Sequence, residues 1–196
     1  AVSGIAEQFG AYIKGKSRIK VTGSATGQYG ADIQSYQIEV NREIANRATF
    51  TSGYLVSSGQ EKVIFRATDT RGYTSTKTVL FDVLYYAPPR VDSFNAHRSD
   101  ASGRANPQGS YAKTDYQATL TSLNDKNTRI YKIRYRPLGE SSWTEIDLLN
   151  DRYTLTGSRV IPNVNPSQSY EVEFIVRDYF GEASQKVRLG TSFVTM

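Results

Sequence analysis

One strand-and-turn unit occurs twice in this chain of 196 residues and constrains its architecture more than any other feature. In the later copy, residues 171–181, Val172, Phe174 and Val176 alternate with charged residues. That alternation predicts a strand with one face on a core and the other in solvent. Residues 62–72 repeat the pattern 109 positions earlier (181 − 72). Two copies separated by about one small domain predict two similar domains in tandem.

The turn residues of the two copies correspond at the same offset, Asp69 to Asp178 and Gly72 to Gly181. An Asp side chain can bond the backbone two residues on, and Gly adopts the positive φ that hairpins often need. We therefore expect equivalent turns with positive φ at both glycines. Each turn should lead into a returning strand, at residues 74–83 and 182–194.

The composition supports an all-β chain, because it is rich in Tyr, Thr, Ser, Val and Ile and poor in Leu. The first eight residues are mostly small or polar, and we expect an N-terminal extension or a first edge strand there. Residues 41–46 should form a polar loop. The chain starts at Ala1 rather than Met, so we expect a piece of a longer protein.

No cysteine is present, so we expect no disulfide. No apolar run approaches the ~18 residues that a membrane span requires, and no signal segment precedes the first strand. The net charge of +5 is mild for this length and is compatible with nucleic acid, an anionic cell wall or simple solubility. We expect no membrane contact and disfavour nucleic acid as a partner.

Two adjacent prolines, Pro88 and Pro89, mark the expected domain boundary. They fix φ near −65° and lack N–H donors, so residues 85–89 favour an extended and fairly stiff connector. We therefore divide the chain into residues 1–86 and 87–196.

The second domain carries a recognisable corner in residues 164–170, with Pro166 and Tyr170 in fixed positions. This segment resembles the tyrosine corner of fibronectin type III domains, in which the Tyr hydroxyl reaches back to upstream backbone. Residues 131–136, followed by Trp143, resemble that family's third strand and the neighbouring one. The resemblance implies a fibronectin type III-like β-sandwich for residues 87–196.

The first domain lacks this corner, because Glu61 stands at the position equivalent to Tyr170. We expect a generic immunoglobulin-like β-sandwich for residues 1–86. The predicted fold class is all-β, with two tandem sandwiches.

Four short motifs, in this order along the chain, resemble structural proteins of siphovirus tails, especially in phages of Gram-positive hosts. They are residues 13–17, 29–33, 69–72 and 85–89. The resemblance implies a structural protein of the extracellular virion, in the tail or tail tip, with other tail proteins as partners. An oligomer in the full-length assembly remains open. We expect a spacer and docking module without enzymatic activity.

Contact residues are predicted near strand ends and turns, namely Tyr111, Tyr179, Arg71 and Arg104. Core and interdomain packing explains most of the 14 tyrosines, but exposed aromatic rings also bind sugars. The alternative function is therefore a carbohydrate-binding or cell-surface adhesion module, in a phage adhesin or a secreted bacterial protein, with host cell-wall carbohydrate as ligand. Residues 103–109 should form a flexible connection or a tip loop that contacts a neighbour.

Catalysis has little support, since His97 is the single histidine and no cysteine is available as a nucleophile or metal ligand. We expect His97 in an exposed polar loop that starts near it and runs to Gly109. No catalytic, cofactor or metal site is predicted.

A basic stripe of Lys132, Arg134 and Arg136 allows two interpretations. It can bind phosphates, or it can face Glu171 and Glu173 across the ladder, because third and sixth strands of such sandwiches are antiparallel neighbours. The first domain reverses the signs, with Glu39 on the third strand and Lys62 and Arg66 on the sixth. Cross-strand pairing is therefore the favoured interpretation.

Overall fold

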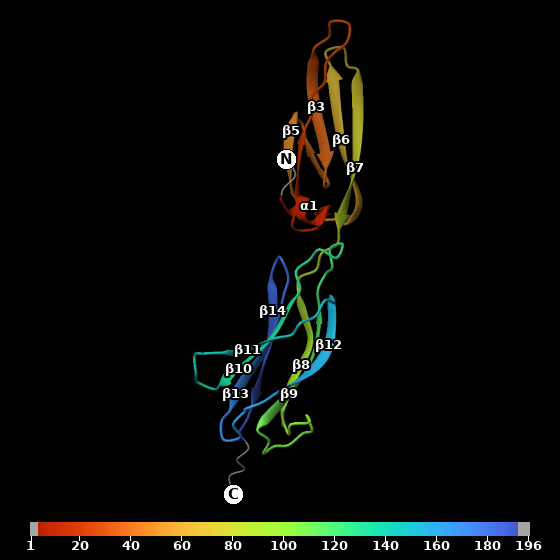
Figure 1. Cartoon of the computed structure of the whole chain (residues 1–196). Helices are drawn as coiled ribbons and strands as arrows, with labels where there is room; N and C mark the ends of the chain where they lie inside the picture. The colour runs from red at the N-terminus through yellow and green to blue at the C-terminus, as the bar shows by residue number, and fades with distance from the viewer. Residues whose placement is uncertain (1–3, 192–196) are drawn as a thin grey trace. The chain divides into compact units, whose positions relative to one another are not determined.

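The computed structural model describes residues 4–191 and divides the chain into two compact units, residues 1–86 and 87–196 (Figure 1). The regular structure of both units is β-strand except for one short helix, so the all-β prediction is confirmed. Each unit has its own hydrophobic core between two sheets, as in immunoglobulin-like and fibronectin type III-like sandwiches.

Unit 1 contains a short helix, α1 (Gly4–Phe9), and seven strands. The strands are β1 (Tyr12–Ile13), β2 (Arg18–Thr22), β3 (Ile33–Val40), β4 (Glu43–Ala45), β5 (Thr49–Tyr54), β6 (Gly59–Asp69) and β7 (Thr74–Leu84). One sheet has the order β1-β7-β6-β3-β4, and the other is the pair β2-β5. The sheets enclose a small core of Ile19, Ile38, Val40, Leu55, Val63 and Val83.

The predicted N-terminal edge strand is wrong for the described residues, because residues 4–9 are helical. Ala6 and Phe9 are buried, and their spacing of three places both side chains on one face of a helix. The N–H of Gly10 donates to the carbonyl of Ala6 and closes the last turn (2.9 Å). Residues 1–3 lie outside the described part of the chain.

The predicted loop at residues 41–46 is wrong for residues 43–45, because β4 pairs there with β3. Asn41 and Arg42 both have positive φ (53° and 63°), which is the geometry of a two-residue type I′ hairpin. Asn favours such a position, whereas Arg gives no such signal in the sequence.

Unit 2 contains seven strands in two sheets. They are β8 (Arg90–Ser99), β9 (Tyr111–Thr119), β10 (Ile130–Pro137), β11 (Thr144–Asp147), β12 (Thr154–Ile161), β13 (Tyr170–Arg177) and β14 (Glu182–Leu189). The sheet orders are β11-β10-β13-β14 and β12-β9-β8. The strand predicted at residues 182–194 is β14, which ends at Leu189. Residues 192–194 lie outside the described part of the chain. Trp143, predicted to lie on a strand, directly precedes β11.

The central strand β13 is covered on both faces. Val172, Phe174 and Val176 are fully buried in the core, as their alternation predicts. Glu173, on the opposite face, is only 4% exposed, so the expectation of a solvent face is wrong there. The guanidinium of Arg134 lies against Glu173, and the ring of Trp143 lies against Arg134 (4.5 Å). These side chains form a layer over the strand.

The corner before β13 has the contact that the resemblance implies. Tyr170 is buried, and its hydroxyl accepts a hydrogen bond from the backbone N–H of Asn165 (3.1 Å). The carboxamide of Asn165 in turn accepts from the N–H of Ser167 (2.9 Å), which places Pro166 inside the turn.

The two equivalent turns differ by one residue, and the prediction for Gly181 is wrong. The N–H of Asp69 donates to the carbonyl of Tyr73, so three residues form the first loop, and Gly72 has φ +87°. The N–H of Asp178 donates instead to the carbonyl of Gly181, which leaves a two-residue loop. Gly181 is therefore the closing residue of its turn and does not have positive φ.

The polar loop predicted from residue 98 begins later, because β8 continues through Ser99. His97 lies on this strand, opposite Lys113 of β9, rather than in an exposed loop. Arg98 is 8% exposed and donates to the carbonyl of Gly190 (2.7 Å) and to that of Gln168 (2.5 Å). It therefore ties β8 to the corner and to the end of β14.

Candidate functional site

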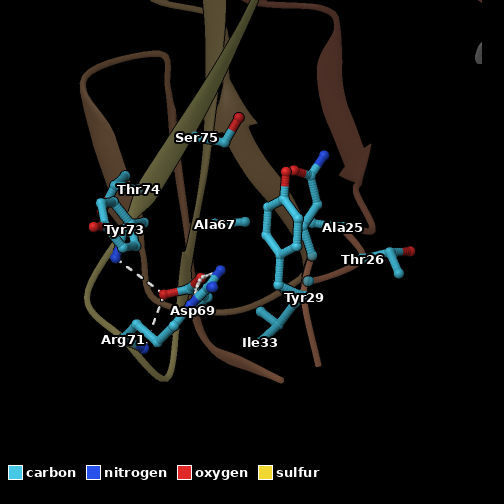
Figure 2. Close-up of a pocket in the computed structure, with 12 residues that line it drawn as sticks. Ala25, Thr26, Tyr29, Ile33, Ala67, Asp69, Arg71, Tyr73, Thr74 and Ser75 are labelled. Atoms are coloured by element: carbon cyan, nitrogen blue, oxygen red, sulfur yellow. Dashed lines mark hydrogen bonds and ion pairs between the residues drawn. The ribbon is translucent and has the colours of Figure 1, made fainter. Parts of the chain in front are cut away.

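A groove of about 520 Å³ lies at one end of unit 1, between residues 25–33 and the β6–β7 hairpin (Figure 2). Tyr29 stands on one side of it, and Arg71 and Tyr73 stand on the other, with Asp69 between them. The groove lies at the opposite end of β7 from the connector to unit 2.

The loop side of the groove depends on close backbone approach. A Cβ at Gly27 would lie 1.9 Å from the carbonyl oxygen of Ala31, so only glycine allows this loop to close. Tyr29 and Gly30 both have positive φ (53° and 79°), which turns the chain sharply. The turn projects the Tyr29 side chain outward, and Tyr29 is 93% exposed.

The hairpin side is organised by the carboxylate of Asp69. It accepts hydrogen bonds from the backbone N–H groups of Arg71 (2.9 Å) and Tyr73 (3.0 Å). The Arg71 guanidinium donates to the same carboxylate (2.7 Å) and lies 5.5 Å from the centre of the Tyr73 ring. Hydrogen bonding by Arg71, opposed by burial, lowers the pKa of Asp69. The carboxylate therefore stays ionised and holds Arg71 and Tyr73 in place.

This arrangement is suited to recognition. Tyr29 and Tyr73 are 93% and 72% exposed and offer ring faces, while Thr26, Thr74 and Ser75 add hydroxyl groups to the lining. Tyr, Ser, Gly and Arg are typical of recognition loops, because a tyrosine gives a large contact area at low entropic cost. Ring faces with hydroxyls nearby can contact the apolar face and the hydroxyls of a sugar.

Of the predicted contact residues, Arg71 alone belongs to this groove. Tyr29 and Tyr73 were not predicted as site residues. Each lies beside a glycine of positive φ, Gly30 and Gly72, and a tyrosine next to such a glycine at a turn is the signal that could have identified them.

The other three predicted contact residues lie in unit 2 and do not form one site. Tyr111 is the half-buried first residue of β9, and Arg104 is exposed in the β8–β9 loop. Tyr179 is 48% exposed in the β13–β14 turn, where its ring packs edge-on against Phe180 (5.0 Å). The N–H of Val164, in the corner before β13, donates to the carbonyl of Ser110, so the neighbouring Tyr111 lies near the start of β13. Tyr179 follows the other end of that strand.

The basic stripe of unit 2 is largely paired. Arg134 contacts Glu173 (2.6 Å) and Arg136 contacts Glu171 (2.7 Å), each across the β10–β13 ladder. The predicted cross-strand pairing is confirmed for these two pairs. Lys132 instead contacts Glu145 (2.7 Å), because β11 pairs with the other edge of β10.

In unit 1 the signs are reversed as predicted, but only one of the two predicted basic residues is paired. Arg66 of β6 contacts Glu39 of β3 (3.2 Å), as predicted. Lys62 lies opposite Leu80 on β7, and no ion pair includes it among residues 4–191. The prediction is therefore wrong for Lys62, because the β3–β6 ladder ends at Val40 and Val63 and gives Lys62 no partner on β3.

Neither a metal cluster nor a membrane-spanning helix is found in residues 4–191. No cluster of three or more His, Cys, Asp or Glu side chains in that range is arranged to hold a metal ion. No helix in the same range has the length and hydropathy required to cross a bilayer.

No protein-family model and no curated protein matches the sequence. Similar solved structures include the FN1–FN3 domains of chicken CNTN1, with 13% identity and a TM-score of 0.36 over 91% of this chain and 65% of that chain. Domains A168–A170 of titin have 16% sequence identity and a TM-score of 0.41, over 96% of this chain and 62% of that chain. The chain thus spans less than two thirds of either structure.

Proposed function

We propose that this chain is a non-enzymatic structural module of a siphovirus tail or tail tip, where it acts as a spacer and docking element among other tail proteins. The tandem of two complete sandwich units is the observation that carries the proposal. The viral setting is supported by the four motifs described above, including the connector at residues 85–89. The proposed location is accordingly the extracellular virion.

The connector supports a spacer role because residues on each side of the boundary are anchored within their own unit. The ammonium groups of Lys14 and Lys16 lie over the rings of Tyr85 (5.7 Å) and Tyr86 (5.2 Å). In unit 2, the N–H of Ala87 donates to the hydroxyl of Thr121 (3.0 Å), and that hydroxyl donates to the carbonyl of Ala87 (2.9 Å). Such anchoring limits the number of freely rotating residues at the boundary.

Four carboxyl groups whose pKa is shifted belong to structural pairs. A general acid requires a carboxyl group whose pKa is raised, whereas four carboxyl groups here have a lowered pKa because a neighbouring side chain donates a hydrogen bond. The pairs are Asp69 with Arg71, Asp100 with Ser102, Glu145 with Lys132 and Glu171 with Arg136. Each pair holds a turn or a strand ladder.

Purified phage particles test the viral setting directly. Antibodies raised against residues 1–196 should label the tails of intact virions, and mass spectrometry should find the chain in gradient-purified particles. Recovery of the parent protein only from the host cytoplasm, with none in the particles, would contradict the proposal.

Carbohydrate binding at the groove is a second candidate function, and the exposure of Tyr29 and Tyr73 on its two sides favours it. The wild-type chain should then bind purified Gram-positive cell walls. Tyr29→Ala and Tyr73→Ala should each weaken binding by roughly tenfold, because each removes one stacking surface. Tyr179→Ala, in the β13–β14 turn of unit 2, is the matched control. Absence of wall and glycan binding by the wild-type chain would remove this candidate.

A further inference from the structure

The strand β7 leaves most of one edge unpaired. It pairs with β6 along its length, but on its other side β1 pairs only with Val83 and Leu84. Within residues 4–191, no other strand lies beside the outer edge of residues 74–82. This open stretch is nine residues long, which is longer than most strands in globular proteins.

The free backbone groups of this edge can be assigned from the alternation of an antiparallel ladder. In such a ladder, every second residue directs its N–H and C=O away from the partner strand. Leu84 belongs to the outward set, because its carbonyl accepts from the N–H of Lys14 of the segment that follows β1 (3.0 Å). Counting back by two, Asp82, Leu80, Thr78, Thr76 and Thr74 also direct their backbone groups outward.

Apolar side chains are exposed on both faces of the same edge. Val79 is 51% exposed and Leu80 is 59% exposed, and neighbouring residues of a strand point to opposite faces. Side chains of β7 are less exposed where β1 covers the strand. Val83 is 3% exposed, and the ring of Tyr12 packs edge-on against Phe81 (5.3 Å). The open stretch therefore lacks the cover that β1 supplies further along.

The edge strand of unit 2 provides the contrast within the same chain. β14 carries three charged residues, Glu182, Lys186 and Arg188, among its eight residues. β7 carries only Lys77 and Asp82 among eleven, and no proline. Charges and prolines are the usual protection of an exposed edge, so β7 is less protected than β14 and is open to strand addition.

We propose that two copies of this chain associate by antiparallel pairing of their β7 strands about a twofold axis at Thr78. The open stretch, residues 74–82, is centred on Thr78, so this register uses its whole length in both copies. The outward residues of each copy, Thr74, Thr76, Thr78, Leu80 and Asp82, then supply the hydrogen bonds in both directions, and the two five-stranded sheets become one of ten strands.

The side chains of the edge are self-complementary in this register. Thr78 meets Thr78 of the second copy, and Thr76 meets Leu80. Lys77 meets Val79, so its aliphatic stem covers the exposed valine, and no like charges stand directly opposite each other. The inference does not rest on the viral proposal, since it concerns the isolated chain.

Analytical ultracentrifugation of the full 196-residue chain tests the pairing. The wild type should show a concentration-dependent dimer. Val79→Lys places a lysine opposite Lys77 of the second copy, whereas Val79→Glu places a carboxylate there. We expect the dimer dissociation constant of Val79→Lys to exceed that of Val79→Glu by roughly tenfold or more. Circular dichroism should show that both variants keep the wild-type fold.

A second pair of variants separates the edge from a general effect on folding. Thr78→Pro removes an outward N–H of β7 and should abolish the dimer, whereas Arg188→Pro on the protected edge β14 should leave it intact. A wild-type chain that stays monomeric at several hundred micromolar would overturn the inference. Equal dissociation constants for Val79→Lys and Val79→Glu would overturn the register about Thr78.

Discussion

Arg98 is buried, although arginine side chains are usually exposed. Its guanidinium is buried at one end of unit 2 and is surrounded by backbone carbonyls, including those of Gly190, Gln168 and Asn165 (3.3 Å). No ion pair includes it in the described part of the chain. Burial lowers its pKa, but an arginine in such a site remains charged. A single cation thus joins the first strand, the tyrosine corner and the end of the last strand.

Replacement of Arg98 by methionine should be strongly destabilising. The variant keeps the apolar stem but leaves several buried carbonyls without a donor, so unit 2 should lose about 2–4 kcal/mol of unfolding free energy. Chemical denaturation measures the change. Arg104→Met, in the exposed loop that follows β8, is the control and should change stability by less than about 0.5 kcal/mol. A comparable small effect at both positions would contradict the assigned role of Arg98.

Tyr131 should make unit 2 sensitive to alkaline pH. Burial raises the pKa of its phenol to about 12, and its hydroxyl donates to the carbonyl of Arg152 (2.8 Å). An unfolded chain ionises this phenol near pH 10. The contribution of Tyr131 to stability is therefore fully present below pH 10, falls between pH 10 and 12, and is lost above 12. The total loss should be roughly 2–3 kcal/mol.

Denaturation curves at pH 9, 10, 11 and 12 measure this loss. Tyr131→Phe cannot ionise, so it should start from a lower stability at pH 9 and decline less steeply toward pH 12. If the wild type and Tyr131→Phe decline in parallel, this phenol does not ionise differently in the folded and unfolded chains.

At the scale of elements, the sequence predicted what local alternation controls. The alternation in residues 171–181 places Val172, Phe174 and Val176 on one face, and all three are buried. It did not predict α1, because six residues are too few for a helical period to stand out. It also did not predict the role of Arg98, whose carbonyl partners at Asn165, Gln168 and Gly190 are 67 to 92 positions away.

The candidate groove also combines features that local sequence predicts with features that depend on distant pairing. The turn at Gly72 was predictable from local sequence, and Arg71 was identified with it. The approach of Tyr29 to Tyr73 depends on the pairing of β3 with β6, which brings Ile33 opposite Asp69. Local patterns cannot give that register, because a shift of one residue moves every side chain to the other face.

The two hairpin turns allow a matched test of an element-scale difference. Gly72→Ala should destabilise unit 1 by about 1–2 kcal/mol, because an alanine at φ +87° is strained. Gly181→Ala should change the stability of unit 2 by less than about 0.5 kcal/mol, since φ is not positive there and no atom lies within 4 Å of the added Cβ. Thermal unfolding followed by circular dichroism compares the two. Equal losses would mean that the turns are equivalent after all.

The tyrosine corner is a second element whose contribution can be measured. Tyr170→Phe removes the hydroxyl that accepts from Asn165 and should cost unit 2 about 0.5–1.5 kcal/mol. Urea denaturation gives the change, and Tyr111→Phe at the first residue of β9 is the control. An unchanged midpoint for Tyr170→Phe would show that the hydrogen bond adds nothing to stability.

The whole molecule consists of two sandwiches in tandem along the chain, each with a separate core. The core of unit 1 contains residues from 19 to 83, and that of unit 2 contains residues from 94 to 189. The boundary falls between Tyr86 and Ala87. Each unit therefore has the core that a separately folding domain requires.

Separate expression of residues 1–86 and 87–196 tests this claim most directly. Each fragment should give a β-type circular dichroism spectrum and one cooperative thermal transition, and the two melting temperatures should reproduce those of the full chain within a few degrees. A fragment that is unfolded alone but folds in the full chain would contradict the account of two independent cores.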